Sequence, residues 1–274
     1  MQHQDHEAPQ KNVFIAASSD SKRNVFGART AENSAGFLRP YLKPGMRLLD
    51  CGCGPGSITL GLAAMVAPGE TIGIDSDPGS IDLSRKLAAE QGSANVRFEV
   101  ADVNEIPFPD ASFDVVFSHA VLLHLRNPIR ALKEMRRVLK QGGLIGIRND
   151  DMDGMLMVPP DSLLEQGWAL MEQVMQRNGG NIRGAKHSRA WLREGGFTRT
   201  ELSASYEYYG TLAATAWWSG IRIQVLRSIQ ESATELGLTD PATIERICAA
   251  WHEWGTNPDA FFGKAWCEAI GWVD

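Results

Sequence analysis

The segment that most constrains this chain is a short apolar run that ends in an acid and enters a glycine-rich turn, residues 48–56. The run reads as a strand that closes at Asp50, and a helix is expected to begin near Ser57. Glycines at alternate positions allow the backbone to pass close to a ligand, where a Cβ would collide. The N–H groups at the start of the following helix then face an anionic or polar group. These glycines are Gly52, Gly54 and Gly56.

The spacing of the glycines separates two classes of nucleotide-like ligand. The dinucleotide fingerprint is G-x-G-x-x-G. Counted from Gly52 and Gly54, its third glycine would fall at Ser57. In this chain the third glycine comes one residue earlier, at Gly56, and the whole turn is preceded by Asp50.

A second acid follows the next apolar run. Residues 71–75 read as a strand that ends at Asp75, and an acid there can accept hydrogen bonds from both hydroxyls of a ribose. The alternative is that Asp75 or Asp77 caps the helix that begins near Pro78. We assign the cap mainly to Asp77 and the ribose to Asp75.

Three further patterns continue the alternation of strands and helices. Residues 96–101 read as a strand that is followed by Asp102. Residues 113–118 read as another strand, whose end carries the polar pair Ser118-His119. Residues 131–140 have apolar side chains at helical spacing. A glycine pair closes that helix, and a fifth strand is expected near residues 144–149.

In this order, the motifs resemble those of the class I S-adenosylmethionine (SAM) dependent methyltransferases. The sequence D-x-G-x-G-x-G resembles motif I of that family, and R-V-L-K-Q-G-G differs from the usual R-V-L-K-P-G-G only at Gln141. The resemblance covers residues 29–150 closely and the remainder loosely. It is strongest to small-molecule enzymes of quinone biosynthesis and secondary metabolism.

The resemblance implies a cofactor, SAM, its product S-adenosylhomocysteine, and a set of binding residues. Asp102 would face the adenine amino group, with the backbone N–H of Val103 on the ring. Arg29 is expected either to meet the SAM carboxylate or to lie on the surface. The full predicted cofactor set is Asp50, Gly52, Cys53, Gly54, Gly56, Asp75, Ser76, Asp102, Val103, Ser118, His119 and Arg29.

The predicted fold is α/β: a Rossmann-like, mostly parallel sheet of seven strands with helices on both faces and a helical C-terminal cap. The sixth strand is expected at residues 197–202, with part of the last at 205–209. Domain boundaries are predicted as a disordered tail (1–20), a SAM-binding core (21–150), an insertion helix with the final strands (151–210) and a helical substrate-side cap (211–274). Two cap-then-proline pairs, at Asp240 and Asn257, predict helix starts.

Composition limits the partners. The net charge of −6, without a run of basic residues, argues against nucleic acid and anionic membranes. No apolar run has membrane-spanning length and the start lacks a secretory pattern, so a cytoplasmic protein is predicted. Cys51 and Cys53 lack further ligands nearby, so no metal is expected.

The predicted reaction is an in-line transfer of a methyl group to O, N or C of a small, apolar or aromatic acceptor. His119 and His124 are the candidate bases, and hydrogen bonding within the loop is the alternative role for each. Trp217, Trp218 and nearby tyrosines are candidates for the pocket wall, although core packing or a homodimer interface would also explain the aromatic C-terminal third.

Two other functions remain open from the sequence. The first is a nicotinamide-dependent oxidoreductase. It is disfavoured because Ser57 stands where the dinucleotide fingerprint requires glycine, and because no catalytic Tyr-x-x-x-Lys pair follows. A non-catalytic SAM-binding module would keep the same motifs. Methylation of nucleic-acid bases is disfavoured because residues 118–121 read Ser-His-Ala-Val.

Overall fold

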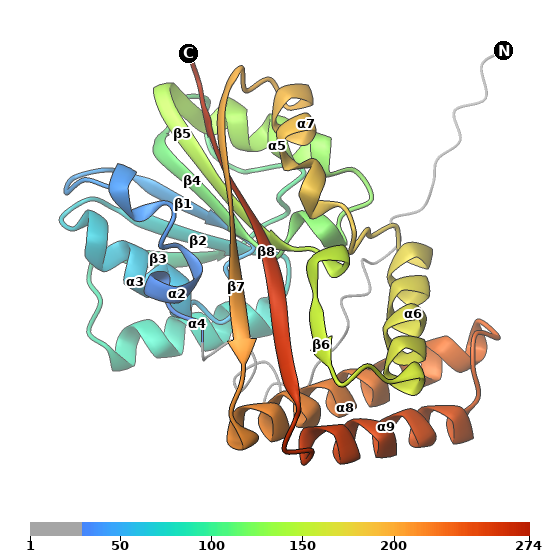
Figure 1. Cartoon of the computed structure of the whole chain (residues 1–274). Coiled ribbons are helices and arrows are strands. Elements are labelled where there is room, and N and C mark those ends of the chain that lie inside the picture. Colours follow the sequence, from blue (N-terminus) through green and yellow to red (C-terminus); the bar gives the residue numbers. More distant parts are fainter. Residues whose placement is uncertain (1–28) are drawn as a thin grey trace, which may run out of the picture.

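The computed structural model describes residues 29–274, so the predicted tail at 1–20 and the first residues of the predicted core lie outside the described residues. Within that range, one mixed sheet carries helices on both faces, and a helical cap lies beyond one end of it (Figure 1). The predicted class, a mostly parallel Rossmann-like sheet with C-terminal helices, is confirmed. The strands are β1 (Leu48–Cys51), β2 (Thr71–Asp75), β3 (Val96–Val100), β4 (Phe113–His119), β5 (Leu139–Asp150), β6 (Leu156–Val158), β7 (Arg199–Tyr209) and β8 (Phe261–Trp272).

The helices alternate with the strands in the first half, and three of the four α-helices in the second half gather in the cap. The α-helices are α2 (Ala31–Ser34), α3 (Ser57–Val66), α4 (Pro78–Glu90), α5 (Pro128–Val138), α6 (Ser162–Arg177), α7 (Ser188–Glu194), α8 (Leu212–Glu235) and α9 (Pro241–Gly255). Short 3-10 turns are η1 (Arg39–Tyr41), η2 (Leu122–His124), η3 (Met152–Gly154) and η4 (Ala185–His187).

Three helices begin with the same local device, an Asp or Asn cap followed by proline. The carboxylate of Asp77 accepts hydrogen bonds from the backbone N–H groups of Gly79 and Ser80 at the start of α4. Asn127 caps α5 and Asp240 caps α9 in the same way. Proline fixes a helical φ at a position whose N–H has no helical partner, so the pair sets each start locally. The predicted starts near Pro78 and Pro241 are therefore confirmed.

The sheet has the order β3-β2-β1-β4-β5-β8, with β6 and β7 both paired to β8. The pairs among β1 to β5 are parallel, and β8 is antiparallel to β5, β6 and β7. β1 and β2 are buried at every residue, as strands covered on both faces are. Parallel pairing brings the carboxyl ends of β1, β2, β3 and β4 to one edge of the sheet.

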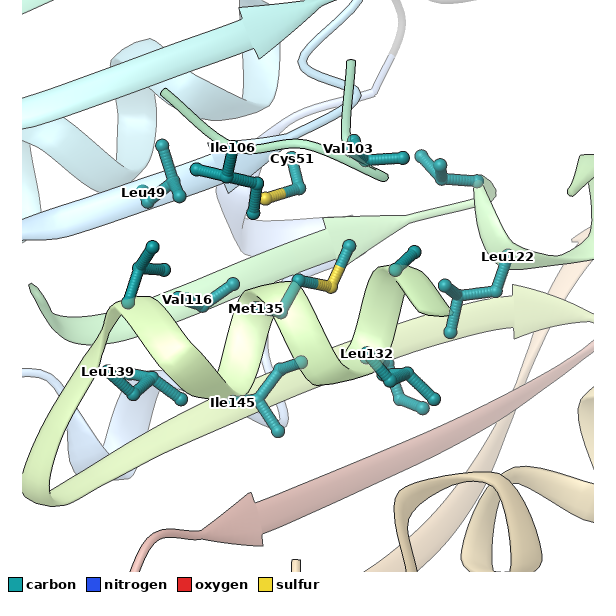
Figure 2. Close-up of a cluster of buried hydrophobic side chains, with 14 of the residues drawn as sticks. Leu49, Cys51, Val103, Ile106, Val116, Leu122, Leu132, Met135, Leu139 and Ile145 are labelled. Carbon is teal, nitrogen blue, oxygen red and sulfur yellow. The ribbon is translucent and has the colours of Figure 1, made fainter. Parts of the chain in front are cut away.

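Two apolar layers hold the helices on the sheet. On one face, α5 and α7 pack on β1, β2, β4 and β5; Figure 2 shows Leu132 and Met135 of α5 opposite Val116 and Ile145. On the other face, α2 and α3 cover Leu48, Val115 and Phe117, and α4 packs beside α3 on Phe98. A separate apolar cluster joins α6, α8 and α9 with Phe262 of β8.

The prediction of a helix starting at Asn257 is wrong. The Asn257 side chain accepts a hydrogen bond from the backbone N–H of Asp259 and closes a turn, after which the chain becomes β8. β8 is the last strand, so the segment predicted as a helical cap, 211–274, is helical only as far as the end of α9. The final strands, predicted within 151–210, therefore extend beyond that range. The predicted sixth strand and the segment 205–209 form the single strand β7.

The packing of α5 on the sheet generates a stability prediction. Leu132→Ala removes a fully buried side chain and leaves a cavity, so it should lower the free energy of unfolding by about 2–5 kcal/mol. Leu212→Ala, at a 59% exposed leucine in the first turn of α8, should change it by less than about 0.5 kcal/mol. Urea unfolding of both variants measures the difference, and equal losses would contradict this packing.

Candidate functional site

The candidate site lies along the edge where the parallel strands end. The turn after β1 is tied to β2 because the backbone N–H groups of Gly52 and Cys53 donate to the carbonyl of Ile74, at 2.8 and 2.9 Å. A Cβ at Gly52 would collide with Val121. Gly54 differs, since its φ is +53° and none of the described residues comes within 4 Å of where a Cβ would stand. The turn is thus packed against Val121 at Gly52 and open at Gly54, and a backbone that binds a cofactor needs such an opening.

Asp75, at the end of β2, joins the two loops that flank this opening. Its Oδ2 accepts a hydrogen bond from the N–H of Gly54 at 2.9 Å, and its Oδ1 accepts one from the N–H of Asp77, also at 2.9 Å. A carboxylate offers about four lone-pair sites, the kind of acceptor that ribose hydroxyls require. The side chain is at the predicted place, and Asp77 rather than Asp75 caps the helix.

Asp50 lies beneath the turn rather than in it. It is 2% exposed, and its Oδ2 accepts a hydrogen bond from the Thr59 hydroxyl at 2.6 Å. Burial, reinforced by the neighbouring Asp75 and opposed by the Thr59 hydrogen bond, raises the pKa of Asp50 to about 7. A cationic group bound above the turn would favour the ionised carboxylate.

The other predicted cofactor residues extend the same edge. Asp102 is exposed after β3, where its Oδ1 accepts hydrogen bonds from the backbone and side-chain N–H groups of Asn104. Val103 is buried and Ser76 exposed. Ser118 is buried near the end of β4, and its hydroxyl has no hydrogen-bond partner within residues 29–274.

His119 ends β4 and has an unusual environment. It is 6% exposed, it stacks on Trp266 with ring centroids 4.7 Å apart, and neither ring nitrogen has a hydrogen-bond partner in the described part of the chain. Burial, followed by the positive charges of Arg29, Arg148 and Lys264, lowers its pKa well below the ordinary value. The imidazole is therefore neutral near pH 7 and presents one donor and one acceptor.

His124 and Arg29 flank the same region. His124 ends η2 and is half-buried; burial lowers its pKa to about 4, against the opposing effect of Asp150. Arg29 is half-buried rather than on the surface, with its guanidinium 5.7 Å from the Trp266 ring. Its pKa is lowered by burial, while Asp150 and Glu207 oppose that effect.

A face of buried and half-buried charges lies beside His119, and no motif of the sequence pointed to it. Lys264 of β8 approaches Asp150 of β5 with Nζ 3.2 Å from Oδ2, and Arg148 pairs with Glu268 at 3.1 Å. Burial alone would raise the pKa of Asp150, but Lys264 and Arg29 outweigh it and hold the pKa below the ordinary value. These side chains share a face because β8 pairs with β5 in antiparallel register, Arg148 opposite Glu268 and Asp150 opposite Trp266.

The edge strand β7 adds a further pair to this face. Glu207 accepts a hydrogen bond from the Tyr209 hydroxyl at 2.6 Å and one from the Trp266 indole N–H at 3.2 Å. Burial, then the charge of Glu207, raises the pKa of Tyr209. Both groups are therefore held in fixed protonation states at neutral pH, with Tyr209 as a phenol and Glu207 ionised.

The aromatic candidates for the pocket wall differ in their burial. Tyr209 and Trp218 are buried and stack at 4.7 Å, and Trp217 packs on Tyr209 at 5.9 Å while 39% exposed. Tyr206 and Tyr208 point away, at 51% and 72% exposed. Side chains alternate along a strand, so Tyr209 and Glu207 face inward while Tyr206 and Tyr208 face outward.

A separate cavity of about 530 Å³ opens between the loop after η2 and helix α7. It is lined by Leu125, Arg126, Asn127, His187 and Trp191 among others, and none of the residues predicted from the sequence lines it. We therefore place the site at the edge of the sheet and not in this cavity.

Neither a metal site nor a membrane-spanning helix is found in residues 29–274. Over residues 29–274, no cluster of three His, Cys, Asp or Glu side chains has the arrangement of a metal site. Burial raises the pKa of the Cys51 and Cys53 thiols well above the ordinary value, which makes them poor metal ligands. Among the helices described, none combines the length and apolarity needed to span a membrane.

An acidic strand end, a glycine turn and a second acid one strand away define a class I SAM-dependent methyltransferase site on this fold. The profile of a family described as a methyltransferase domain matches residues 42–199, more than half of the chain. The chain belongs to that family and is a SAM-dependent methyltransferase.

Named relatives agree with this assignment. An uncharacterized methyltransferase of Schizosaccharomyces pombe is 28% identical over 256 residues, which cover 90% of this chain and 91% of that protein. A demethylmenaquinone methyltransferase of Staphylococcus aureus is 31% identical and covers 62% of this chain and 69% of its own. The SAM complex of Haemonchus contortus phosphoethanolamine N-methyltransferase 2 superposes with a TM-score of 0.59 at 17% identity, over 92% of this chain and 56% of that one, which shows a common fold.

The open space at Gly54 generates a binding prediction. Gly54→Ala should weaken S-adenosylhomocysteine binding by about tenfold or more, because the added methyl enters the space that the cofactor needs. Gly142→Ala is the matched control, since Gly142 also has a positive φ, +73°, and no described neighbour within 4 Å. Both changes should cost roughly 1–2 kcal/mol of stability from the left-handed backbone. Calorimetric titration that finds equal affinities would place the cofactor elsewhere.

The buried carboxyl of Asp50 generates a pH prediction. Its pKa of about 7 in the folded protein exceeds the ordinary 3.8, so the contribution of Asp50 to folding stability is greatest at low pH and is lost as pH rises toward 7. Asp50→Asn keeps an acceptor for Thr59 and removes the proton. Between pH 5 and pH 8, the ligand-free wild type should therefore lose on the order of 2 kcal/mol relative to Asp50→Asn. Urea unfolding at both values measures it; Asp82→Asn, at an exposed carboxyl, should follow the wild type.

Proposed function

We propose that this methyltransferase acts on a small molecule held between His119 and the buried charged face formed by Arg148, Asp150, Glu207, Lys264 and Glu268. The observation that carries the proposal is the pair of unpartnered nitrogens on His119. A buried polar atom without a partner costs about 1–3 kcal/mol, which a bound acceptor would offset.

The enclosure of this region supports a small acceptor. Lys264 and Glu268 are 8% and 7% exposed, and the helices α6, α8 and α9 pack around the nearby end of β8. A polymer would need an open surface, and for nucleic acid that surface would be basic. The net charge of −6 supports the same conclusion. A cytoplasmic location and a homodimer remain proposals that rest on the sequence.

We further propose which residues hold the cofactor. The opening at Gly54 would take the amino-acid part, Asp75 the ribose and Asp102 with Val103 the adenine, in the order in which their strands lie in the sheet. The remaining members of the proposed set are Asp50, Gly52, Cys53, Gly56, Ser76, Ser118, His119 and Arg29.

The proposed mechanism relies mainly on positioning. When bound, SAM supplies an electrophilic methyl carbon on a sulfonium. The protein's part is to hold the acceptor atom in line and to exclude water. The paired charges of Asp150 with Lys264 and Arg148 with Glu268 make the wall rigid, because separating either buried pair would leave an uncompensated charge.

His119 is suited to hydrogen-bond the acceptor and to receive a proton only late in the reaction. Its low pKa makes it a weak base, so it would serve an acceptor that loses its proton as the new bond forms. His124, with its pKa of about 4, is likewise neutral near pH 7. Neither histidine should therefore impose a pH dependence on turnover above pH 6.5.

Methyl transfer from labelled SAM to fractionated cell extract tests the proposed function. Label should enter a small-molecule fraction, and the protein should bind S-adenosylhomocysteine by calorimetry. Label found only in protein or nucleic acid would contradict a small acceptor. Absence of S-adenosylhomocysteine binding would contradict the cofactor site itself.

His119→Phe tests the proposed contact with the acceptor. Phenylalanine keeps the ring that stacks on Trp266 and removes both nitrogens. Turnover with the labelled fraction should fall by roughly tenfold to a hundredfold, and by more than the affinity for S-adenosylhomocysteine falls. His187→Phe, at an exposed histidine, is the matched control. Unchanged turnover in His119→Phe would remove His119 from the reaction.

A further inference from the structure

Arg222 is a buried cation in the cap without an acidic partner. It lies on the inner face of α8 and is 5% exposed. The other buried cations of the site are paired, Arg148 with Glu268 and Lys264 with Asp150. Arg222, in contrast, makes no ion pair anywhere in residues 29–274. A buried charge is costly unless it is paired, so this arginine requires an explanation.

Tryptophan rings surround the guanidinium. Its Cζ lies 3.7 Å from the centroid of Trp168 and 5.8 Å from those of Trp218 and Trp251. One terminal nitrogen, Nη2, contacts the Met171 sulfur at 3.3 Å, a weak acceptor. The rings stabilise the charge from their faces but accept no strong hydrogen bond.

Arg222 and the rings around it include three donors without acceptors. The Nε of Arg222 and the indole N–H groups of Trp218 and Trp251 are buried, and each lacks a hydrogen-bond partner among the described side chains and backbone. Unsatisfied buried donors are rare in native proteins, and several around one cation indicate a group that brings acceptors. An anionic oxygen group would supply hydrogen-bond acceptors for these donors and a negative charge to pair with the guanidinium.

The position of Arg222 connects it to the proposed acceptor region. The centroid of the Trp218 ring is 5.8 Å from Cζ of Arg222 and 5.9 Å from Nζ of Lys264, so this ring is close to both cations. Lys264 belongs to the charged face beside His119.

The charge of Arg222 persists at physiological pH. Burial lowers its pKa to about 9, and Asp150 opposes that effect at a distance. The guanidinium therefore remains protonated near pH 7.

We propose that Arg222 binds a carboxylate on the methyl acceptor, so that the substrate is a small organic acid whose anionic end points into the tryptophan-lined part of the cap. This inference rests on the proposed small-molecule function and names its substrate class. The planar fork of arginine matches a carboxylate, and the adjacent rings suit an apolar or aromatic body. The competing role for Arg222 is purely structural, as a cation that packs α6, α8 and α9 together.

Direct binding to the wild-type protein, saturated with S-adenosylhomocysteine, tests the proposal without turnover. The probes are acid and amide pairs of equal shape, from acetate and acetamide to benzoate and benzamide. Calorimetry or quenching of tryptophan fluorescence reports affinity. At least one acid should bind about tenfold more tightly than its amide. No preference for any acid would overturn the proposal.

Variants separate recognition from packing. Arg222→Met keeps an unbranched apolar side chain and should abolish the preference for the acid, with S-adenosylhomocysteine affinity within about twofold of wild type. Arg227→Met, at an exposed arginine of the same helix paired with Glu245, should keep the preference. A preference that survives in Arg222→Met would show a purely structural role.

If Arg222→Met does not fold, Arg222→Lys decides. It keeps the positive charge and loses the Nε donor and the planar fork, so acid binding should weaken severalfold while cofactor binding is retained. Acid binding equal to wild type would overturn the assignment to the guanidinium. These outcomes are distinct from failure of methyl transfer to the small-molecule fraction, because none of them depends on turnover.

Discussion

The antiparallel pairing of β8 with β5 is the constraint on which the proposed acceptor region of this protein depends. β8 lies between β5 and β7, so its backbone groups are satisfied on both edges and its register is fixed on both sides. That register places Lys264, Trp266 and Glu268 on the same face as Arg148 and Asp150. A shift by one residue would move this entire set to the opposite face of the sheet. The charged face thus follows from strand pairing more than from any single ion pair.

The cofactor side depends on local chain geometry, and the substrate side on distant segments. The turn after β1 and the acid that ends β2 lie close together because parallel strands end at one edge. The region near His119 draws on β4, β5, β7, β8 and α8, which are scattered from residue 113 to the C-terminus. This division fits an enzyme family whose members share SAM and differ in acceptor, because the shared part is local and the variable part is assembled from the cap.

Most of the fold could be predicted because its signals are local. Apolar runs that end in Asp50 and Asp75, and the Asp77-Pro78 cap, each fix structure within a few residues. β8 could not be predicted in this way. Its inward side chains Phe262, Trp266 and Ile270 recur every four residues, a spacing that puts side chains on one face of a helix and also on one face of a strand. Lys264 and Glu268 have that spacing too, and the Asn257-Pro258 pair resembles a helix cap.

The sequence by itself determined the class of enzyme and its cofactor. It also led to the edge of the sheet at which we propose that the cofactor binds, because a glycine turn and strand-end acids act through neighbouring backbone. Only the tertiary structure decided how His119, Asp150, Lys264 and Arg222 come together. Their environments are set by burial and by partners that are distant in the sequence. Arg148 and Glu268, which form an ion pair, are 120 residues apart. Desolvation and charge pairing depend on what surrounds a side chain in space, and no sequence spacing encodes that directly.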